Sequence, residues 1–312
     1  MSLLIHIGLY KTATTYLQWS VFRDPELGYT RVGDRGEMFE HIIFNQSIDW
    51  DAERSRAAFG ERIAAAEAAG KVPVISDEHF MGPIGCSFYR YEYILERLRR
   101  MFPDSKVLMT VRDQEAILVS MYAEYVRAGG TLTFRRFIAQ VPLRDGFDPE
   151  FDRTYLDYYS LLRTIHQYFA PEKVLVLSQN LLKENPEAFW EELKTFSGVQ
   201  SDAVPCFDVF RPSQTLTYLA LQRLLNFVTL DRKPNRRRIF LWRLFGFLNR
   251  RLPVRVFDQN IRRYQIREFR QSLRPYYVEA NRNLREYLET TLGQKGRAMY
   301  QRLMFPDHLE AG

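Results

Sequence analysis

Residues 3–22 read LLIHIGLYKTATTYLQWSVF, and this stretch decides the fold that the sequence predicts. The apolar run Leu3–Leu9 has the length and composition of a buried β-strand, and 14–22 has the composition of a helix. A turn of glycine and small hydroxyl residues between a strand and a helix directs backbone N–H groups to one point, where the helix N-terminus adds partial positive charge. The stretch therefore predicts an anion-binding loop, with a threonine-rich helix cap as the alternative. The side chains that add charge or hydroxyl donors are Lys11, Thr12, Thr14 and Thr15.

Strand-like and helix-like segments alternate beyond this loop, which is typical of a parallel sheet covered by helices. Further strands are expected at Val72–Ser76, Lys106–Val111 and Lys173–Leu177, and helices at 53–69, 91–101, 115–128, 152–169 and 186–196, while 24–50 looks irregular. From Ser213 onward only helices are expected. The sequence thus predicts an α/β fold whose central parallel sheet has four or five strands flanked by helices. We expect a single domain over residues 1–312, with 205–275 as a basic helical insertion or lid.

Length and composition narrow the class of protein. The chain has 312 residues, of which 46% are hydrophobic and 26% charged, so a wholly disordered or collagen-like chain is excluded. Two cysteines, Cys86 and Cys206, cannot build a disulfide scaffold or a structural zinc site, and a reducing, cytoplasmic location is expected. The apolar run at the start is too short for a signal-peptide core, and no window has the ~18 uninterrupted apolar residues of a membrane helix.

The positive charge is concentrated in one region. Residues 211–274 hold 16 Lys and Arg but three acidic residues, so the rest of the chain is acidic although the whole carries +6. A basic block on an acidic body indicates an anionic partner, either a polyanion, an anionic lipid surface or a phosphorylated ligand. A solvated, arginine-rich helical face is the equally open alternative.

The loop differs from the phosphate loop of magnesium-dependent kinases. That motif reads GxxxxGK[ST], and the hydroxyl after its lysine holds Mg²⁺. Here Lys11 follows Gly8 by three residues, and Ala13 takes the place of the second glycine. A nucleotide or small-molecule kinase is therefore the disfavoured alternative, and no metal is expected.

Residues 6–18, HIGLYKTATTYLQ, resemble the 5′-phosphosulfate loop of sulfotransferases that use 3′-phosphoadenosine 5′-phosphosulfate (PAPS), commonly H-x-G-x-x-K-[TS]-[GA]-[TS]-[TS]. The resemblance implies a P-loop-like α/β fold with C-terminal helices as a lid. Ala13 stands where glycine is more common, which leads us to expect a negative φ there. The residues that the resemblance assigns to the 5′-phosphosulfate are Gly8, Lys11, Thr12, Ala13, Thr14 and Thr15.

A second segment is similar to the same family. The strand KVLMTV (106–111) runs into Arg112, and Ser120 follows eight residues later in the next predicted helix. Residues at a strand's carboxyl end and in the following helix can converge on a ligand over the sheet edge. In the sulfotransferases an Arg and a Ser at this spacing hold the 3′-phosphate, and the resemblance implies that role for Arg112 and Ser120. Weaker likeness extends over 154–200 and 277–289, whereas Arg211-Pro-Ser213 lacks the Asn that bacterial members often have in Asn-x-Ser.

The strand Val72–Ser76 ends in Asp77-Glu78-His79, at the edge where a base for the acceptor hydroxyl belongs. Members of the family use a Glu or a His from this part of the fold. We expect Glu78 first and His79 second, although histidine titrates near neutrality without help and a glutamate base needs burial or a nearby anion. Asp77 is a third candidate, and His6 is expected to be a packed histidine.

The resemblance implies transfer of a sulfuryl group from PAPS to a hydroxyl, or less readily an amine, of a carbohydrate or small molecule. Lys11 would ease departure of the nucleotide by neutralising the bridging oxygen. The basic, aromatic region 232–255 is either a helix that packs on the core or a cap that contacts an acceptor or an anionic membrane surface. A non-enzymatic module that binds a polyanion or membrane through this region is the remaining alternative, and no specific nucleic-acid partner is expected.

Overall fold

The computed structural model describes residues 3–44, 49–81, 91–139, 151–207, 216–229, 255–306 and 309. The chain divides into two compact units. The first, termed the sheet unit, comprises Met1–Asp113, Thr154–Phe210 and Tyr277–Gly312. The second, termed the helical unit, comprises Gln114–Arg153 and Arg211–Tyr276. The expected single domain with an insertion at 205–275 stays a prediction.

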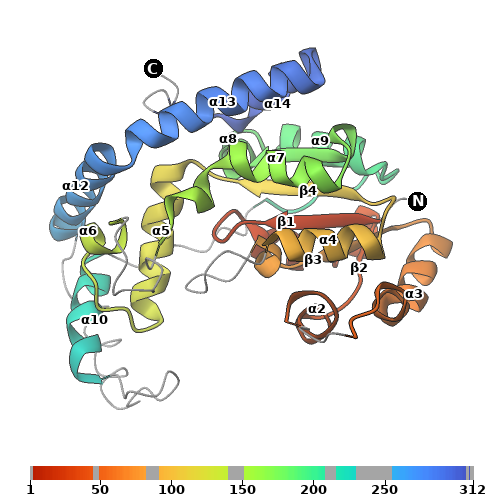
Figure 1. The fold of residues 1–312 in the computed structure, drawn as a ribbon, viewed down its shortest axis with the longest axis horizontal. Coiled ribbons are helices and arrows are strands. Elements are labelled where there is room, and N and C mark those ends of the chain that lie inside the picture. The colour runs from red at the N-terminus through yellow and green to blue at the C-terminus, as the bar shows by residue number, and fades with distance from the viewer. Residues whose placement is uncertain are drawn as a thin grey trace. The chain divides into compact units, whose positions relative to one another are not determined.

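The sheet unit is built on a five-stranded sheet in the order β2-β3-β1-β4-β5, and each neighbouring pair is parallel (Figure 1). The predicted α/β fold with a central parallel sheet is thus confirmed. The strands are β1 (Leu4–Gly8), β2 (Tyr29–Arg31), β3 (Val72–Ser76), β4 (Lys106–Val111) and β5 (Val174–Ser178).

The expectation that residues 24–50 are irregular is wrong. This segment contains β2, the short helix α2 (Arg35–Met38) and a π-helical turn, Phe39–Ile43. A three-residue strand carries no readable alternation of apolar and polar residues. It exists because β3 lies beside it and pairs Tyr29 with Val72.

Strand side chains alternate between the two faces of the sheet. On one face Leu4, Val74, Leu108 and Leu177 join a core cluster with Tyr16, Leu17, Phe189 and Trp190. The last two belong to α9 (Pro186–Ser197), which follows α8 (Gln179–Glu184). Elsewhere α3 (Ala52–Ala68) packs on β3, and α4 (Tyr91–Met101) contacts α3 and α7 (Tyr158–Tyr168).

Side-chain caps fix several helix starts in this unit. The helix expected at 152–169 begins only at Tyr158, because the Asp157 carboxylate accepts from the Ser160 N–H and a 3₁₀ turn, Arg153–Leu156, precedes it. Other starts are capped by Asp34, Asp51, Ser178 and Asn185.

The helical unit contains α5 (Gln114–Arg127), α6 (Phe134–Phe137), α10 (Leu216–Thr229) and α12 (Arg255–Ser272). Helix α5 packs against α10 and α12. The Asn226 amide on α10 donates to the carbonyls of Val126 and Gly130 and so ties α10 to the end of α5.

The last helices of the chain are α13 (Arg274–Leu292) and α14 (Gln294–Leu303), and α14 contacts β5. Residues 232–254 of the basic region lie outside the described residues, as do Arg211 and Ser213. Over the described ranges, every helix falls short of the length or the apolar character that crossing a bilayer demands.

Candidate active site

Three segments that carry predicted site residues meet at one edge of the sheet. β1 lies between β3 and β4, and the register pairs His6 with Ser76 and Gly8 with Thr110. Because the three strands are parallel, the chain leaves all of them at the same edge. The loop after Gly8, the segment from Asp77 and the residue Arg112 therefore belong to one site in the sheet unit.

A buried polar layer underlies the loop. His6 contacts the Ser76 hydroxyl through Nδ1 at 2.7 Å and the Thr110 hydroxyl through Nε2 at 3.2 Å. The Thr12 hydroxyl donates to the Leu9 carbonyl at 2.6 Å and lies 2.9 Å from the Thr110 hydroxyl. Burial, with a contribution from nearby Arg31, lowers the pKa of His6 to about 3, so the imidazole is neutral. His6 is thus a packed histidine that ties β1 to both neighbours.

Gly8 allows the helix after the loop to start against the strand. That helical segment consists of α1 (Thr14–Tyr16), continued by a π-helical stretch, Leu17–Val21. A Cβ at Gly8 would lie 2.0 Å from Thr14 Cγ2 and 3.1 Å from the His6 ring. Real side chains do not approach so closely, and the position therefore requires glycine.

Two residues of the loop adopt the left-handed backbone conformation. Lys11 has φ 67° and Ala13 has φ 68°. The expectation of negative φ at Ala13 is wrong, because the loop must turn from β1 into α1 within a few residues. Left-handed residues within a turn bring successive N–H groups to one side, as in anion-binding nests. Non-glycine residues pay roughly 1–2 kcal/mol for this conformation, and such strain is concentrated at functional sites.

The start of α1 has no side-chain cap among the described residues. Ala13 stands at the N-cap position, and only its carbonyl takes part in the helix, accepting from the Leu17 N–H. The first N–H groups of a helix need partners from outside the helix. An anion bound in the loop would provide them.

Arg112 lies beside this loop. Its Nη1 donates to the Lys11 carbonyl at 3.4 Å, and its own carbonyl accepts from the Tyr158 hydroxyl at 2.5 Å. The structure thus brings Arg112 and Lys11 together from positions 101 residues apart. Ser120 lies in α5 of the helical unit, and its convergence with Arg112 stays a prediction.

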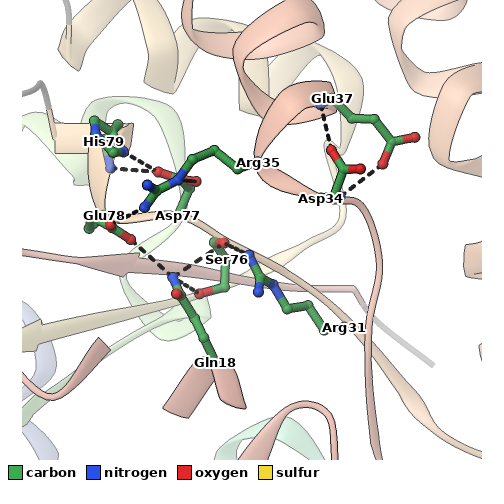
Figure 2. Close-up of polar contacts among 9 residues, drawn as sticks. All are labelled: Gln18, Arg31, Asp34, Arg35, Glu37, Ser76, Asp77, Glu78 and His79. Atoms are coloured by element: carbon green, nitrogen blue, oxygen red, sulfur yellow. Dashed lines mark hydrogen bonds and ion pairs between the residues drawn. The ribbon is translucent and has the colours of Figure 1, made fainter. Parts of the chain in front are cut away.

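The Asp77 carboxylate holds His79 (Figure 2). Its Oδ1 accepts from the His79 backbone N–H at 2.9 Å and from the imidazole Nδ1 at 2.6 Å. The Asp77 side chain is 1% exposed, and that of His79 is 15% exposed. The His79 ring also makes edge-to-face contacts with Tyr10 and Phe39, whose centroids lie 5.5 and 4.9 Å away.

Glu78 has different partners. It forms an ion pair with Arg35 through Oε1, and its Oε2 accepts from the Gln18 amide at 3.3 Å (Figure 2). The same amide donates to the Ser76 hydroxyl at 3.2 Å. The Tyr10 hydroxyl stays protonated, because its pKa is raised. Burial is the main cause, with smaller contributions from Tyr155 and from the Glu78 and Asp77 carboxylates.

Gln18, Arg35 and Tyr10 were not singled out from the sequence. The sequence does contain a pattern that predicts a helix start at Arg35. Asp34 and Glu37 form a reciprocal capping box at the start of α2, and Arg35 is the first residue of that helix (Figure 2). Gln18 carries no such signal, since its role depends on where the first helical segment packs.

Asp77, Glu78 and His79 also form, among the described residues, a group whose potential metal-ligand atoms lie within 4.8 Å of one another. Arg35 already supplies positive charge to both carboxylates, at 3.9 Å from Asp77 and in the ion pair with Glu78. Ion pairing and hydrogen bonding account for the proximity of these side chains.

The sequence matches no protein-family model and no curated protein. The structure is similar to the crystal structure of a sulfotransferase from Alicyclobacillus acidocaldarius, with a TM-score of 0.50 and 17% identity over 74% of this chain and 97% of that chain. A looser similarity, with a TM-score of 0.34 and 13% identity, covers 96% of this chain and 88% of a mouse sulfotransferase crystallised in complex with PAP.

Proposed function

We propose that this chain, which has the fold of a sulfotransferase, transfers a sulfuryl group from PAPS to a hydroxyl group, or less readily an amine, of a carbohydrate or small molecule. The observation that carries the proposal is the loop Gly8–Thr15. It joins β1 to an uncapped helix start, contains two left-handed residues and bears Lys11. Arg112 lies next to it, as a second cation for a doubly phosphorylated nucleotide.

In this proposal the backbone N–H groups of the loop and Lys11 bind the 5′-phosphosulfate, and Arg112 binds the 3′-phosphate, while the part expected of Ser120 stays a prediction. Arginine suits the second role because its fork can grip a phosphate with two hydrogen bonds. The Thr12 hydroxyl stabilises the loop through its hydrogen bonds with the Leu9 carbonyl and the Thr110 hydroxyl. Thr14 and Thr15 are the first residues of α1. Nucleotide binding in turn supplies the outside partners that the helix start needs.

Sulfuryl transfer depends on positioning and on stabilising charge rather than on covalent help from the protein, by analogy with phosphoryl transfer. Lys11 is assigned to the charge that develops on the bridging oxygen. Glu78 and His79 are the proposed bases for the acceptor proton, since both follow β3 at the same edge as the loop.

The acceptor is proposed to lie over the aromatic group beside His79. Tyr10 and Phe39 contact the His79 ring, and Phe44 packs on Phe39 at 4.7 Å with 42% of its surface exposed. Aromatic side chains of this kind bury large apolar areas and pack against other planar rings. Contact of the region 232–255 with an anionic surface, and the cytoplasmic location, stay predictions.

A titration of 3′-phosphoadenosine 5′-phosphate against ADP tests the nucleotide part. We expect the 3′-phosphate to raise affinity at least about tenfold, which corresponds to roughly 1.4 kcal/mol. Comparable affinity for both nucleotides, or tighter binding of ADP with Mg²⁺, would refute the proposal and favour a kinase.

Lys11→Ala tests the transfer itself. We expect the variant to fold and to lose measurable transfer from PAPS to a panel of carbohydrate and phenolic acceptors. Lys71→Ala removes a lysine that precedes β3 at the opposite end of the strand, and it should leave transfer unchanged. Transfer that persists in Lys11→Ala would remove Lys11 from the mechanism.

A further inference from the structure

We infer that Asp77 is a positioning residue that holds His79 as the proton acceptor of the reaction, and that Glu78 is instead a structural partner of Arg35. This inference rests on the proposed function and decides between the two bases that it leaves open. The observations that carry it are the partners of these side chains, which differ although the residues are adjacent in sequence.

The hydrogen bonds of Asp77 define the state of the imidazole. A carboxylate only accepts hydrogen bonds, so the 2.6 Å contact places a proton on His79 Nδ1. In the neutral ring Nε2 then carries the lone pair. Asp77 also accepts from the His79 backbone N–H at 2.9 Å, so one buried carboxylate fixes both the backbone and the ring of the same residue.

Glu78 is engaged by residues from other parts of the chain. Its Oε1 pairs with Arg35 of α2, and its Oε2 accepts from Gln18. A proton taken up by Glu78 would neutralise the carboxylate and remove the negative charge that pairs with Arg35. Its contacts instead link α2 and the first helical segment to the end of β3.

The His79 ring lies next to the loop that is proposed to hold the sulfuryl group. Tyr10, the residue before Lys11, contacts the ring edge-to-face, and Phe39 contacts it as well. The turn Glu78–Met81 packs against β1. The ring is therefore confined by two aromatic side chains and by Asp77, yet part of it is exposed.

The chemical step follows from this arrangement. The acceptor oxygen attacks the sulfur of PAPS and forms the new S–O bond while its proton passes to His79 Nε2. The bond between sulfur and the bridging oxygen breaks, and its electrons stay on the 5′-phosphate of the leaving nucleotide. His79 becomes an imidazolium that remains hydrogen-bonded to the Asp77 carboxylate and later releases its proton to water.

Asp77→Leu tests the inference, because leucine keeps the size of the side chain but removes Oδ1, the atom that accepts from both the backbone N–H and Nδ1 of His79. The ring proton is then no longer fixed on Nδ1, and the lone pair that the reaction needs is no longer held on Nε2. We expect kcat to fall about 10²- to 10⁴-fold, the range found for general bases and for loss of the orienting carboxylate in Ser-His-Asp triads. Affinity for 3′-phosphoadenosine 5′-phosphate should stay within about twofold.

A spectroscopic readout separates positioning from a structural role. In protein with ¹⁵N-labelled histidine, we expect the ring nitrogens of His79, assigned by their loss in His79→Gln, to show the Nδ1–H tautomer. Asp77→Leu should shift them toward the Nε2–H tautomer. Asp157→Asn is the control, since it removes the charge of another buried aspartate of the sheet unit and introduces a residue that caps helices equally well. It should leave tautomer and kcat unchanged.

An Nε2–H tautomer in the wild-type protein would overturn the inference without any variant of Asp77 having to fold. Wild-type kcat in Asp77→Leu or in His79→Gln would also overturn it, provided that the wild-type chain binds the nucleotide and transfers the sulfuryl group. A wild-type chain that does neither refutes the proposed function itself, and with it the role of His79 in this reaction.

Discussion

Replacing Gly8 with alanine tests whether the first turn of α1 must pack directly against β1. The new Cβ would lie 2.0 Å from Thr14 Cγ2. Since carbon atoms pack at about 3.5–4.0 Å, the Thr14 methyl group would have to move by roughly 1.5 Å or more. Thr14 is buried and β-branched, so rotation of its side chain is restricted. The start of α1 must therefore shift away from the strand.

The cost follows from two opposing effects. Overpacking of this kind costs about 1–3 kcal/mol. The lower entropy of the unfolded alanine chain offsets roughly 0.4–1 kcal/mol of it. We expect a net loss of about 1–2 kcal/mol in the free energy of unfolding, measured by urea titration. At roughly 2–4 °C per kcal/mol for a unit of this size, Tm should fall by about 4 °C.

The same shift displaces the loop N–H groups. We therefore expect affinity for 3′-phosphoadenosine 5′-phosphate, measured by calorimetry, to fall at least about tenfold, or 1.4 kcal/mol. Gly60→Ala in α3 is the matched control, because its Cβ meets nothing within 4 Å and alanine favours a helix by about 0.5–1 kcal/mol. Adding Thr14→Ser to Gly8→Ala removes the colliding methyl group and should restore most of the stability. Wild-type Tm and affinity in Gly8→Ala would refute the reasoning.

Two further predictions concern the polar layer beneath the loop. Thr110→Val keeps the shape of the side chain but removes the hydroxyl that lies near His6 and Thr12. We expect it to lower the free energy of unfolding by about 1–3 kcal/mol, measured by urea titration. An unchanged free energy of unfolding would show that the layer is not a stabilising network. Burial, with a contribution from Arg31, lowers the pKa of His6 from 6.5 to about 3. Between pH 6.5 and pH 3 the unfolded chain therefore binds more protons than the folded chain, and the folded state loses stability as the pH falls. The contribution of His6 between pH 7 and pH 5 should be about 2 kcal/mol, and a His6→Gln variant with the same pH dependence as the wild type would contradict it.

Most of the sheet could be predicted because it depends on local composition. β1, β3, β4 and β5 are buried on both faces of a parallel sheet and therefore read as continuous apolar runs. β2 could not be predicted in this way. Its sequence, Tyr29-Thr30-Arg31, is short and polar, and only its pairing with β3 makes it a strand.

The backbone of the loop is likewise only partly predictable from the sequence. The motif predicts an anion-binding turn, but the intrinsic preference of alanine predicts the wrong sign of φ at Ala13. The close approach of α1 to Gly8 overrides that preference, because the turn has few residues in which to reverse direction. Gly8 itself is explained by a contact with Thr14, which no rule of local propensity contains.

The sequence by itself determined the class of fold and the edge of the sheet at which the candidate residues gather, because strands and helices reflect the pattern of near neighbours. It placed Asp77, Glu78 and His79 together and ranked Glu78 before His79, but it did not contain the partners of these side chains. Only the tertiary structure shows the partners of these side chains. Glu78 pairs with Arg35 and accepts from Gln18, whereas His79 is hydrogen-bonded to Asp77. The physical reason is that a side chain's chemistry depends on its partners, and for Glu78 these come from segments 43 and 60 residues away in the chain.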